Sequence, residues 1–172
     1  LIVPKATAKK LISMGVIDDV TLTYTKNSAV FKSDEYTIYT RLIEGKYFAY
    51  QKMFTEGEIN TCASRTALIG AMTRAKMCTE EKQPAVFQIE DDVLNISIRD
   101  KLADYQEQVP LQETVCKSIR LGFDSRLVLE TLKAFTCDNI ALGFTSPRTP
   151  MIVEAEDSDM KAMVLPVAIR EA

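Results

Sequence analysis

The chain has 172 residues, of which 47% are apolar and 26% are charged, and its formal net charge is −3. A chain of this length can bury a core without disulfide bonds, and this composition is typical of a folded globular protein. It contains no histidine, which removes the commonest general base and the commonest transition-metal ligand and so disfavours an enzyme.

Three segments are predicted to form helices: residues 5–14, 64–78 and 124–136. Ser64 and Asp124 stand where N-cap residues are expected, because their side-chain oxygens can accept from the first-turn N–H groups. Apolar side chains share one face of each of the two later helices: Leu68, Ala71, Met72, Ala75 and Cys78, then Leu127, Leu129, Leu132 and Phe135. Both faces predict packing against a sheet.

A stretch with strand character follows each predicted helix, and turn residues divide it into a hairpin and a further strand. The turns are predicted at residues 26–28, 33–34, 90–92, 146–147 and 156–157. Short strands at residues 58–62 and 117–123 precede the second and third helices. The pattern indicates an α+β protein in which one helix-plus-strands unit recurs about every 60 residues.

The recurrence also predicts the domain organisation. If two units make one compact domain, three units make one and a half, with a boundary near residues 53–57.

The chain starts with Leu1 rather than Met, so we expect it to begin inside a longer protein, without a signal peptide. The longest apolar run, residues 162–169, is far shorter than the about 20 residues of a membrane-spanning helix.

Charge is distributed unevenly along the chain. The first two predicted helices each carry three basic side chains and no acidic one, and the third is neutral overall, although the whole chain is −3. The strands and loops therefore hold the acidic excess. Basic helices suggest a phosphate partner such as the nucleic-acid backbone, while the alternative is that these side chains are ordinary solvated helix residues.

Other clusters give weaker indications of chemistry. The acidic runs at residues 90–92 and 154–159 could bind a hard metal ion, but turns explain them better, and no cofactor motif occurs. Four cysteines lie far apart among apolar neighbours, which predicts buried free thiols in a reducing cytoplasm: Cys62, Cys78, Cys116 and Cys137.

Two runs carry a resemblance to a known family: TRLIEGKYFAYQKMF (residues 40–54) and MVLPV (residues 163–167). They resemble segments of bacterial sliding clamps, the beta subunits of DNA polymerase III. The first run is similar to the junction of the family's second and third domains, and the second is similar to its C-terminal run. Residues 2–12 and 119–154 also resemble the family, so the resemblance covers essentially the whole chain. It implies a DNA-clamp fold with helices on one face of the sheets, in which residues 1–53 are half of domain two and residues 54–172 are domain three.

The resemblance also implies a non-catalytic function. Such clamps close as ring dimers around duplex DNA and bind short peptide motifs of the polymerase catalytic subunit, the clamp loader and repair proteins. The helices line the hole, where the basic side chains would face DNA: Lys5, Lys9, Lys10, Arg65 and Arg74. The dimer edge would fall on Met77, Cys78, Asp104 and Glu107.

The family's peptide pocket is an apolar cleft between domains that accepts a leucine and an aromatic side chain. Carried over by position, it would include Phe48, Tyr50, Lys52, Met53, Arg148, Pro150, Met163, Val164, Leu165, Pro166 and Val167. Phe48 stands where the family usually has proline.

Two other interpretations stay open. One is a small α+β protein that binds a metal ion or a metabolite through an acidic turn. The other is a divergent clamp copy that does not close a ring.

Overall fold

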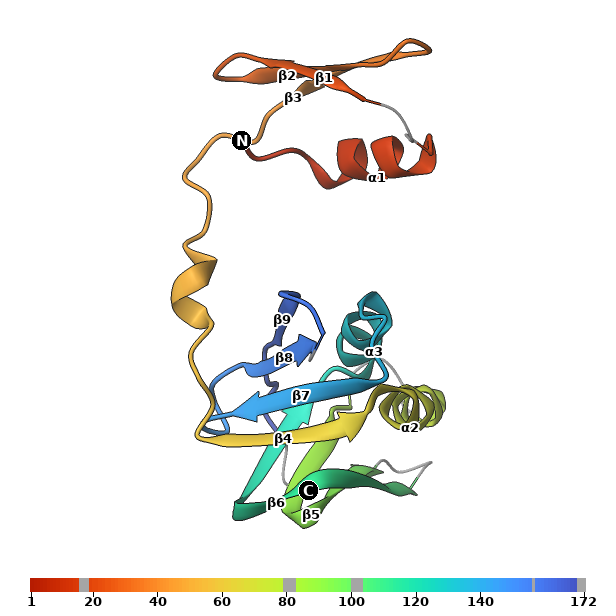
Figure 1. Cartoon of the computed structure of the whole chain (residues 1–172), viewed down its shortest axis with the longest axis vertical. Helices are drawn as coiled ribbons and strands as arrows, with labels where there is room; N and C mark the ends of the chain where they lie inside the picture. The colour runs from red at the N-terminus through yellow and green to blue at the C-terminus, as the bar shows by residue number, and fades with distance from the viewer. Residues whose placement is uncertain (16–18, 79–82, 100–103, 156, 170–172) are drawn as a thin grey trace. The chain divides into compact units, whose positions relative to one another are not determined.

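A computed structural model describes residues 1–15, 19–78, 83–99, 104–155 and 157–169. The chain divides into two compact units, Leu1–Tyr50 and Gln51–Ala172, and each is described by itself (Figure 1). A short 3-10 helix, η1 (Tyr50–Met53), lies at this division. No helix among the described residues is long and apolar enough to span a membrane.

The described residues of the first unit form one helix and three strands: α1 (Lys5–Ser13), β1 (Thr21–Tyr24), β2 (Ser28–Lys32) and β3 (Thr37–Arg41). The strands form an antiparallel sheet in the order β1-β2-β3, and the predicted turns at residues 26–28 and 33–34 are confirmed. The helix and the sheet are joined by a 2.8 Å hydrogen bond between the hydroxyls of Thr7 and Thr40. Among the described residues of this unit, the buried apolar side chains are Ala29 and Leu42, and α1 buries none.

The second unit contains a six-stranded antiparallel sheet with the order β5-β6-β4-β7-β8-β9 and two helices. In chain order its elements are β4 (Ile59–Ser64), α2 (Arg65–Met77), β5 (Ala85–Arg99), β6 (Asp104–Phe123), α3 (Ser125–Ala134), β7 (Asn139–Phe144), β8 (Met151–Ala155) and β9 (Lys161–Val164). The helix-plus-antiparallel-strands architecture predicted from the sequence is confirmed.

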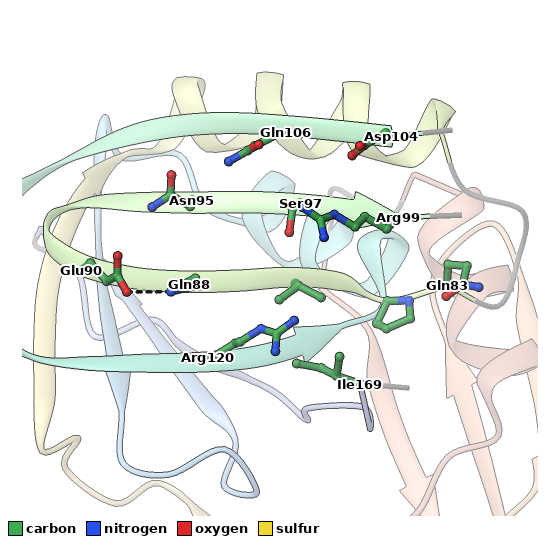
Figure 2. A pocket seen from close by; sticks show the side chains of 12 residues that line it. Gln83, Gln88, Glu90, Asn95, Ser97, Arg99, Asp104, Gln106, Arg120 and Ile169 are labelled. Atoms are coloured by element: carbon green, nitrogen blue, oxygen red, sulfur yellow. Dashed lines mark hydrogen bonds between the residues drawn. The ribbon is translucent and has the colours of Figure 1, made fainter. Parts of the chain in front are cut away.

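The predicted turn at residues 90–92 lies inside the continuous strand β5. Asp91 has a φ of 53°, and β5 pairs with two separate stretches of β6, with register shifts on both sides of Asp91. Figure 2 shows the ribbon of β5 turning back between Glu90 and Asn95. The acidic run is therefore not a hairpin turn between two separate strands but a bend inside β5, where the pairing with β6 is irregular. No group of three or more Cys, Asp or Glu side chains among the described residues could hold a metal ion.

The core of the second unit lies between the sheet and the helices. Both predicted N-caps are confirmed, because the Ser64 side chain accepts from the Ala67 N–H at 3.4 Å and the Asp124 side chain accepts from the Arg126 N–H at 2.9 Å. Helix α2 packs against β4, β5, β6 and α3, and α3 also packs against β9. Along β4 and in both halves of β5, buried residues occur at every second position, as the pleat of a sheet requires.

Two details of the sequence interpretation are wrong. Leu127 is 50% exposed, whereas its neighbour Val128 is buried with Leu129 and Leu132. The reason is that Val128 lies one turn before Leu132 on the helix and so shares its face, whereas Leu127 does not. The cysteines are not all buried: Cys116 is exposed and only Cys137 is fully buried. Cys116 alternates with the buried Val115 on β6 and so points to the opposite face. Of the turn predicted at residues 156–157, Glu156 lies outside the described residues.

Candidate functional site

A cavity of about 410 Å³ lies in the second unit beside the C-terminal segment of the chain. Three stretches of chain meet there: the end of β6, the loop between β7 and β8, and the residues that follow β9. Its lining consists of Arg120, Leu121, Gly122, Pro147, Arg148, Pro166, Val167, Ala168 and Ile169. The volume lies within the range of about 300–1,000 Å³ that is usual for small-ligand and peptide pockets.

The C-terminal segment is held against β6 at Gly122. After β9 ends at Val164, Pro166 has no N–H to continue a ladder, and the next pairing is an isolated bridge in which the Val167 N–H donates to the Gly122 carbonyl at 2.8 Å. A Cβ on Gly122 would lie 2.8 Å from the Val167 carbonyl oxygen and 3.0 Å from Ile169 Cγ1. Glycine is therefore required for this close approach.

The loop between β7 and β8 contributes Pro147 and Arg148 to the lining of the cavity. The Ser146 N–H donates to Thr149 Oγ1 at 2.9 Å, and the Thr149 N–H donates to the Ser146 carbonyl at 3.2 Å. These bonds close a tight turn of the kind that serine and proline favour. The turn leaves Pro147 and Arg148 exposed at the rim of the cavity.

The cavity combines an apolar lining with positive charge. Leu121 is buried, and Ile169 and Pro166 are half-buried. Among the described residues, the charged side chains that line it are Arg120 and Arg148, and none is acidic. The arrangement suits a ligand with both an apolar and an anionic group.

Three of the residues predicted for the peptide pocket line this cavity: Arg148, Pro166 and Val167. Of the other members, Val164 is buried at the end of the edge strand β9, and Leu165 is exposed. The remaining ones do not line the cavity, and they include Pro150 and Met163 together with four residues near the division between the units: Phe48, Tyr50, Lys52 and Met53.

Sequence reasoning missed the wall formed by β6. Arg120, Leu121 and Gly122 precede the C-terminal segment by more than forty residues, and they were assigned only to a strand. One signal was present, because a glycine inside a strand often marks a close approach of another backbone. The other missed lining residues are Pro147, Ala168 and Ile169.

The residues predicted to face DNA fall into two groups. Lys5, Lys9 and Lys10 are exposed on α1. Arg65 is partly buried at the start of α2, where its Nε donates to the Cys137 carbonyl at 2.6 Å. Arg74, near the end of α2, makes a bidentate ion pair with Glu107 of β6, with an Nε to Oε2 distance of 2.8 Å.

The ion pair joins two residues that were predicted to lie on different surfaces: Arg74 on the DNA-facing surface and Glu107 at the dimer edge. The Tyr105 hydroxyl lies within hydrogen-bond distance of both the Glu107 carboxylate and the Ala71 carbonyl. The hydrogen bond from Arg74 lowers the pKa of Glu107, and burial raises the pKa of Tyr105, with Glu107 adding to that rise. Of the other predicted dimer-edge residues, Met77 and Asp104 are exposed and Cys78 is half-buried.

A second cavity, of about 610 Å³, lies on the outer face of β5 and β6 (Figure 2). Its lining is mostly polar, with the amides of Gln83, Gln88, Asn95 and Gln106. It contains both signs of charge: Glu90, Asp104, Arg99 and Arg120. Arg120 and Ile169 line both cavities, so the two are adjacent.

Comparison with known proteins gives the family. Residues 54–168 match the family model described as "DNA polymerase III beta subunit, C-terminal domain". The chain belongs to this family. A curated relative, the beta sliding clamp of Staphylococcus aureus (strain Mu50 / ATCC 700699), is 24% identical over 155 residues, which are 87% of this chain and 41% of the relative.

Solved structures of the family share the fold. The DNA polymerase III subunit beta from Pseudomonas aeruginosa superposes with a TM-score of 0.89 at 20% identity, over 97% of this chain and 47% of that one. A sliding clamp from the same organism, solved bound to griselimycin, gives a TM-score of 0.86 at 20% identity, over 97% of this chain and 48% of that one. The predicted clamp fold is thus confirmed, and the chain spans less than half the length of these relatives.

Proposed function

We propose that the chain is part of a sliding clamp, a non-catalytic ring that holds DNA polymerase on duplex DNA in the bacterial cytoplasm. The observation that carries this proposal is the match of residues 54–168 to the family of DNA polymerase III beta subunits. The intact protein would be a homodimer without a cofactor. It would hold the polymerase by topology, because a closed ring cannot leave the duplex sideways.

Residues 1–53 would be the C-terminal half of the second clamp domain, and residues 54–172 would be the third domain. The exposed apolar side chains of the first unit support this assignment, since a complete domain would cover most of them. They are Ile12, Leu22, Tyr24 and Tyr39.

The DNA-facing surface would be formed by the basic helix residues. Lys5, Lys9 and Lys10 are exposed and available to phosphates. Arg65 and Arg74 are already engaged with protein oxygens, so we expect them to add to the positive field rather than to bind phosphates directly. Contacts between basic side chains and DNA phosphates do not depend on the base sequence of the DNA, and they weaken as the salt concentration rises. The dimer edge would include the exposed side chain of Met77, together with Cys78, Asp104 and Glu107.

The partner-peptide pocket would include the cavity beside the C-terminal segment and the residues carried over from the family. Its ligands would be short extended motifs of the polymerase catalytic subunit, the clamp loader and repair proteins. The apolar lining supports this assignment, and so does the C-terminal segment, which the hydrogen bond from Val167 to Gly122 holds in place. Peptide-binding grooves combine apolar pockets with a few fixed polar groups.

The test is fluorescence polarisation with a labelled peptide that carries a leucine and a phenylalanine. We expect saturable binding, and we expect Val167→Asp to weaken it at least tenfold by placing a charge in the apolar part of the cavity. Met160→Asp is the matched control, because Met160 is 39% exposed and Val167 is 41% exposed, but Met160 does not line the cavity. Absence of saturable binding, or equal losses in the two variants, would remove the pocket assignment.

A further inference from the structure

We propose that three residues beside the start of β4 form a latch, which fixes the direction in which the connection between the two units leaves the second unit. The latch consists of Gly57, Asn60 and Gly143, and the connecting segment is residues 44–56. The inference goes beyond the proposed function, because it concerns the connection itself and does not depend on what the protein binds.

The first part of the latch is a hydrogen bond from a side chain to the backbone. Asn60, the second residue of β4, is exposed, and its Nδ2 donates to the Gly57 carbonyl at 2.8 Å. The bond reaches three residues back along the chain, so it closes a tight turn just before β4 begins. The sheet holds β4 on both sides, through β6 and β7. The Gly57 carbonyl is therefore tied to a strand that cannot move independently.

The second part of the latch is a close approach of two backbones. Asn60 lies directly opposite Gly143 in the pairing of β4 with β7, and Figure 1 shows these two strands side by side. A Cβ on Gly57 would lie 2.7 Å from the Phe144 nitrogen and 2.9 Å from the Gly143 Cα. Backbone atoms cannot give way as the end of a flexible side chain can, so the contact requires glycine at position 57. Gly143 leaves room for the Asn60 amide, because a Cβ there would lie 3.1 Å from Asn60 Oδ1.

The other end of the connecting segment has the opposite character. Gly45 has a φ of 138°, a conformation that residues with a side chain rarely adopt. Among the described residues, apart from its chain neighbours, no atom lies within 4 Å of the position that its Cβ would take. Residues 43–52 are all exposed, and backbone with few packed neighbours is the part of a protein that opens most easily. We therefore expect the connection to bend near Gly45 and to stay fixed at Gly57.

Local contacts stiffen the segment between these two ends. The Tyr47 and Tyr50 rings meet edge to face, with centroids 6.0 Å apart and an interplanar angle of 89°. The Tyr50 N–H donates to the Phe48 carbonyl at 2.8 Å, and η1 follows directly. These contacts support one bending point near Gly45 rather than even flexibility along the whole segment.

The test is the backbone amide order parameter along the connecting segment, measured by NMR relaxation on the 172-residue chain. We expect the value at Gly57 to be about 0.85, as in rigid backbone, and the value at Gly45 to fall below about 0.6. If Gly57 is as mobile as Gly45, the inference is overturned without any variant.

Asn60→Asp removes the donor of the latch at nearly constant side-chain size. The order parameter of Gly57 should then fall towards that of Gly45, because a carboxylate has no proton to donate to the Gly57 carbonyl. Asn95→Asp is the matched control. It adds the same charge to a strand, but Asn95 Oδ1 accepts from Gln108 Nε2 at 3.0 Å, and a carboxylate can keep that bond. Unchanged order at Gly57 in Asn60→Asp, or an equal loss in Asn95→Asp, would contradict the latch.

Gly57→Ala tests the close approach with a different readout, limited digestion by trypsin. Lys46 and Lys52 are both exposed in the connecting segment. The added Cβ must displace the segment at its latched end, so cleavage after Lys52 should become at least about threefold faster. Cleavage after Lys46, on the far side of η1, should keep its rate. Equal acceleration at both lysines would indicate general loosening, and no acceleration at Lys52 would show that the contact holds nothing in place; either result overturns the inference.

Discussion

The first unit and the last part of the second unit have the same order of elements, a helix followed by three strands, but they differ in what they bury. Helix α3 buries Val128, Leu129 and Leu132, and its strands join a sheet that β4 and β6 continue. Helix α1 buries no residue, and its strands β1–β3 form a sheet by themselves. The comparison teaches that one such unit is too small to cover its own apolar face, and that a second unit completes the core.

The largest expected effect comes from truncating the buried face of α3. Leu132→Ala should lower the free energy of unfolding by about 2–5 kcal/mol, because it removes buried methyl groups and leaves a cavity. The counterpart in α1, Ile12→Ala, should change it by less than about 0.5 kcal/mol, since Ile12 is 79% exposed. Urea unfolding followed by circular dichroism measures both, and equal effects would break the comparison.

The next effect concerns the C-terminal segment, which the second unit holds in place. Gly122→Ala should cost about 1–3 kcal/mol, because the new Cβ would meet the Val167 carbonyl. Hydrogen exchange at the Val167 N–H should become faster as the segment is displaced. Gly70→Ala in α2 is the control, where the added Cβ meets only the flexible end of Arg74, and it should stabilise the helix by about 0.5–1 kcal/mol. Unchanged exchange at Val167 in Gly122→Ala would contradict the assigned role of Gly122.

Helix capping gives a smaller difference between the two units. Asp124→Ala should cost about 1 kcal/mol, because it removes the acceptor for the first-turn N–H groups of α3. Helix α1 starts after Pro4 and has no side-chain cap, so Pro4→Ala should leave stability almost unchanged. Thermal unfolding of the two variants tests this, and a larger loss in Pro4→Ala would be inconsistent with the described termini.

The smallest effect is the pH dependence of the ion pair between α2 and β6. The pKa of Glu107 is lowered in the folded chain, chiefly by the hydrogen bond from Arg74. Its contribution to stability is present above the unfolded pKa of about 4.3 and is lost as the pH falls through the lower folded value. Glu107→Gln should therefore lower the urea midpoint slightly at pH 7, and the loss should shrink below about pH 4.

Glu130→Gln, at an exposed position of α3, is the control for the ion pair, and it should leave the urea midpoint unchanged at both pH values. A pH-independent loss in Glu107→Gln would mean that the pair acts through packing rather than charge. High salt should weaken the effect at pH 7, because the Arg74 side chain is largely exposed.

Most of the fold was predictable because it follows from local rules. The caps at Ser64 and Asp124 depend on residues close together in the sequence, and the structure confirms them. The turn predicted at residues 90–92 is instead an irregularity inside the continuous strand β5. The buried face of α3 was predicted less well, since Leu127 and Val128 are equally apolar and only the position of the sheet decides which is covered. The candidate site was predicted in part: Arg148, Pro166 and Val167 line the cavity.

The sequence by itself determined the α+β class, the recurring unit and the resemblance to sliding clamps. The reason is that periodicity, turn residues and motifs are patterns of residues that are close together in the sequence. Only the tertiary structure decided that Arg120 and Gly122 lie beside Val167, and that Arg74 binds Glu107 rather than solvent. The physical reason is that strand pairing and helix packing bring together residues more than thirty positions apart. No local pattern specifies which distant side chain will be the neighbour.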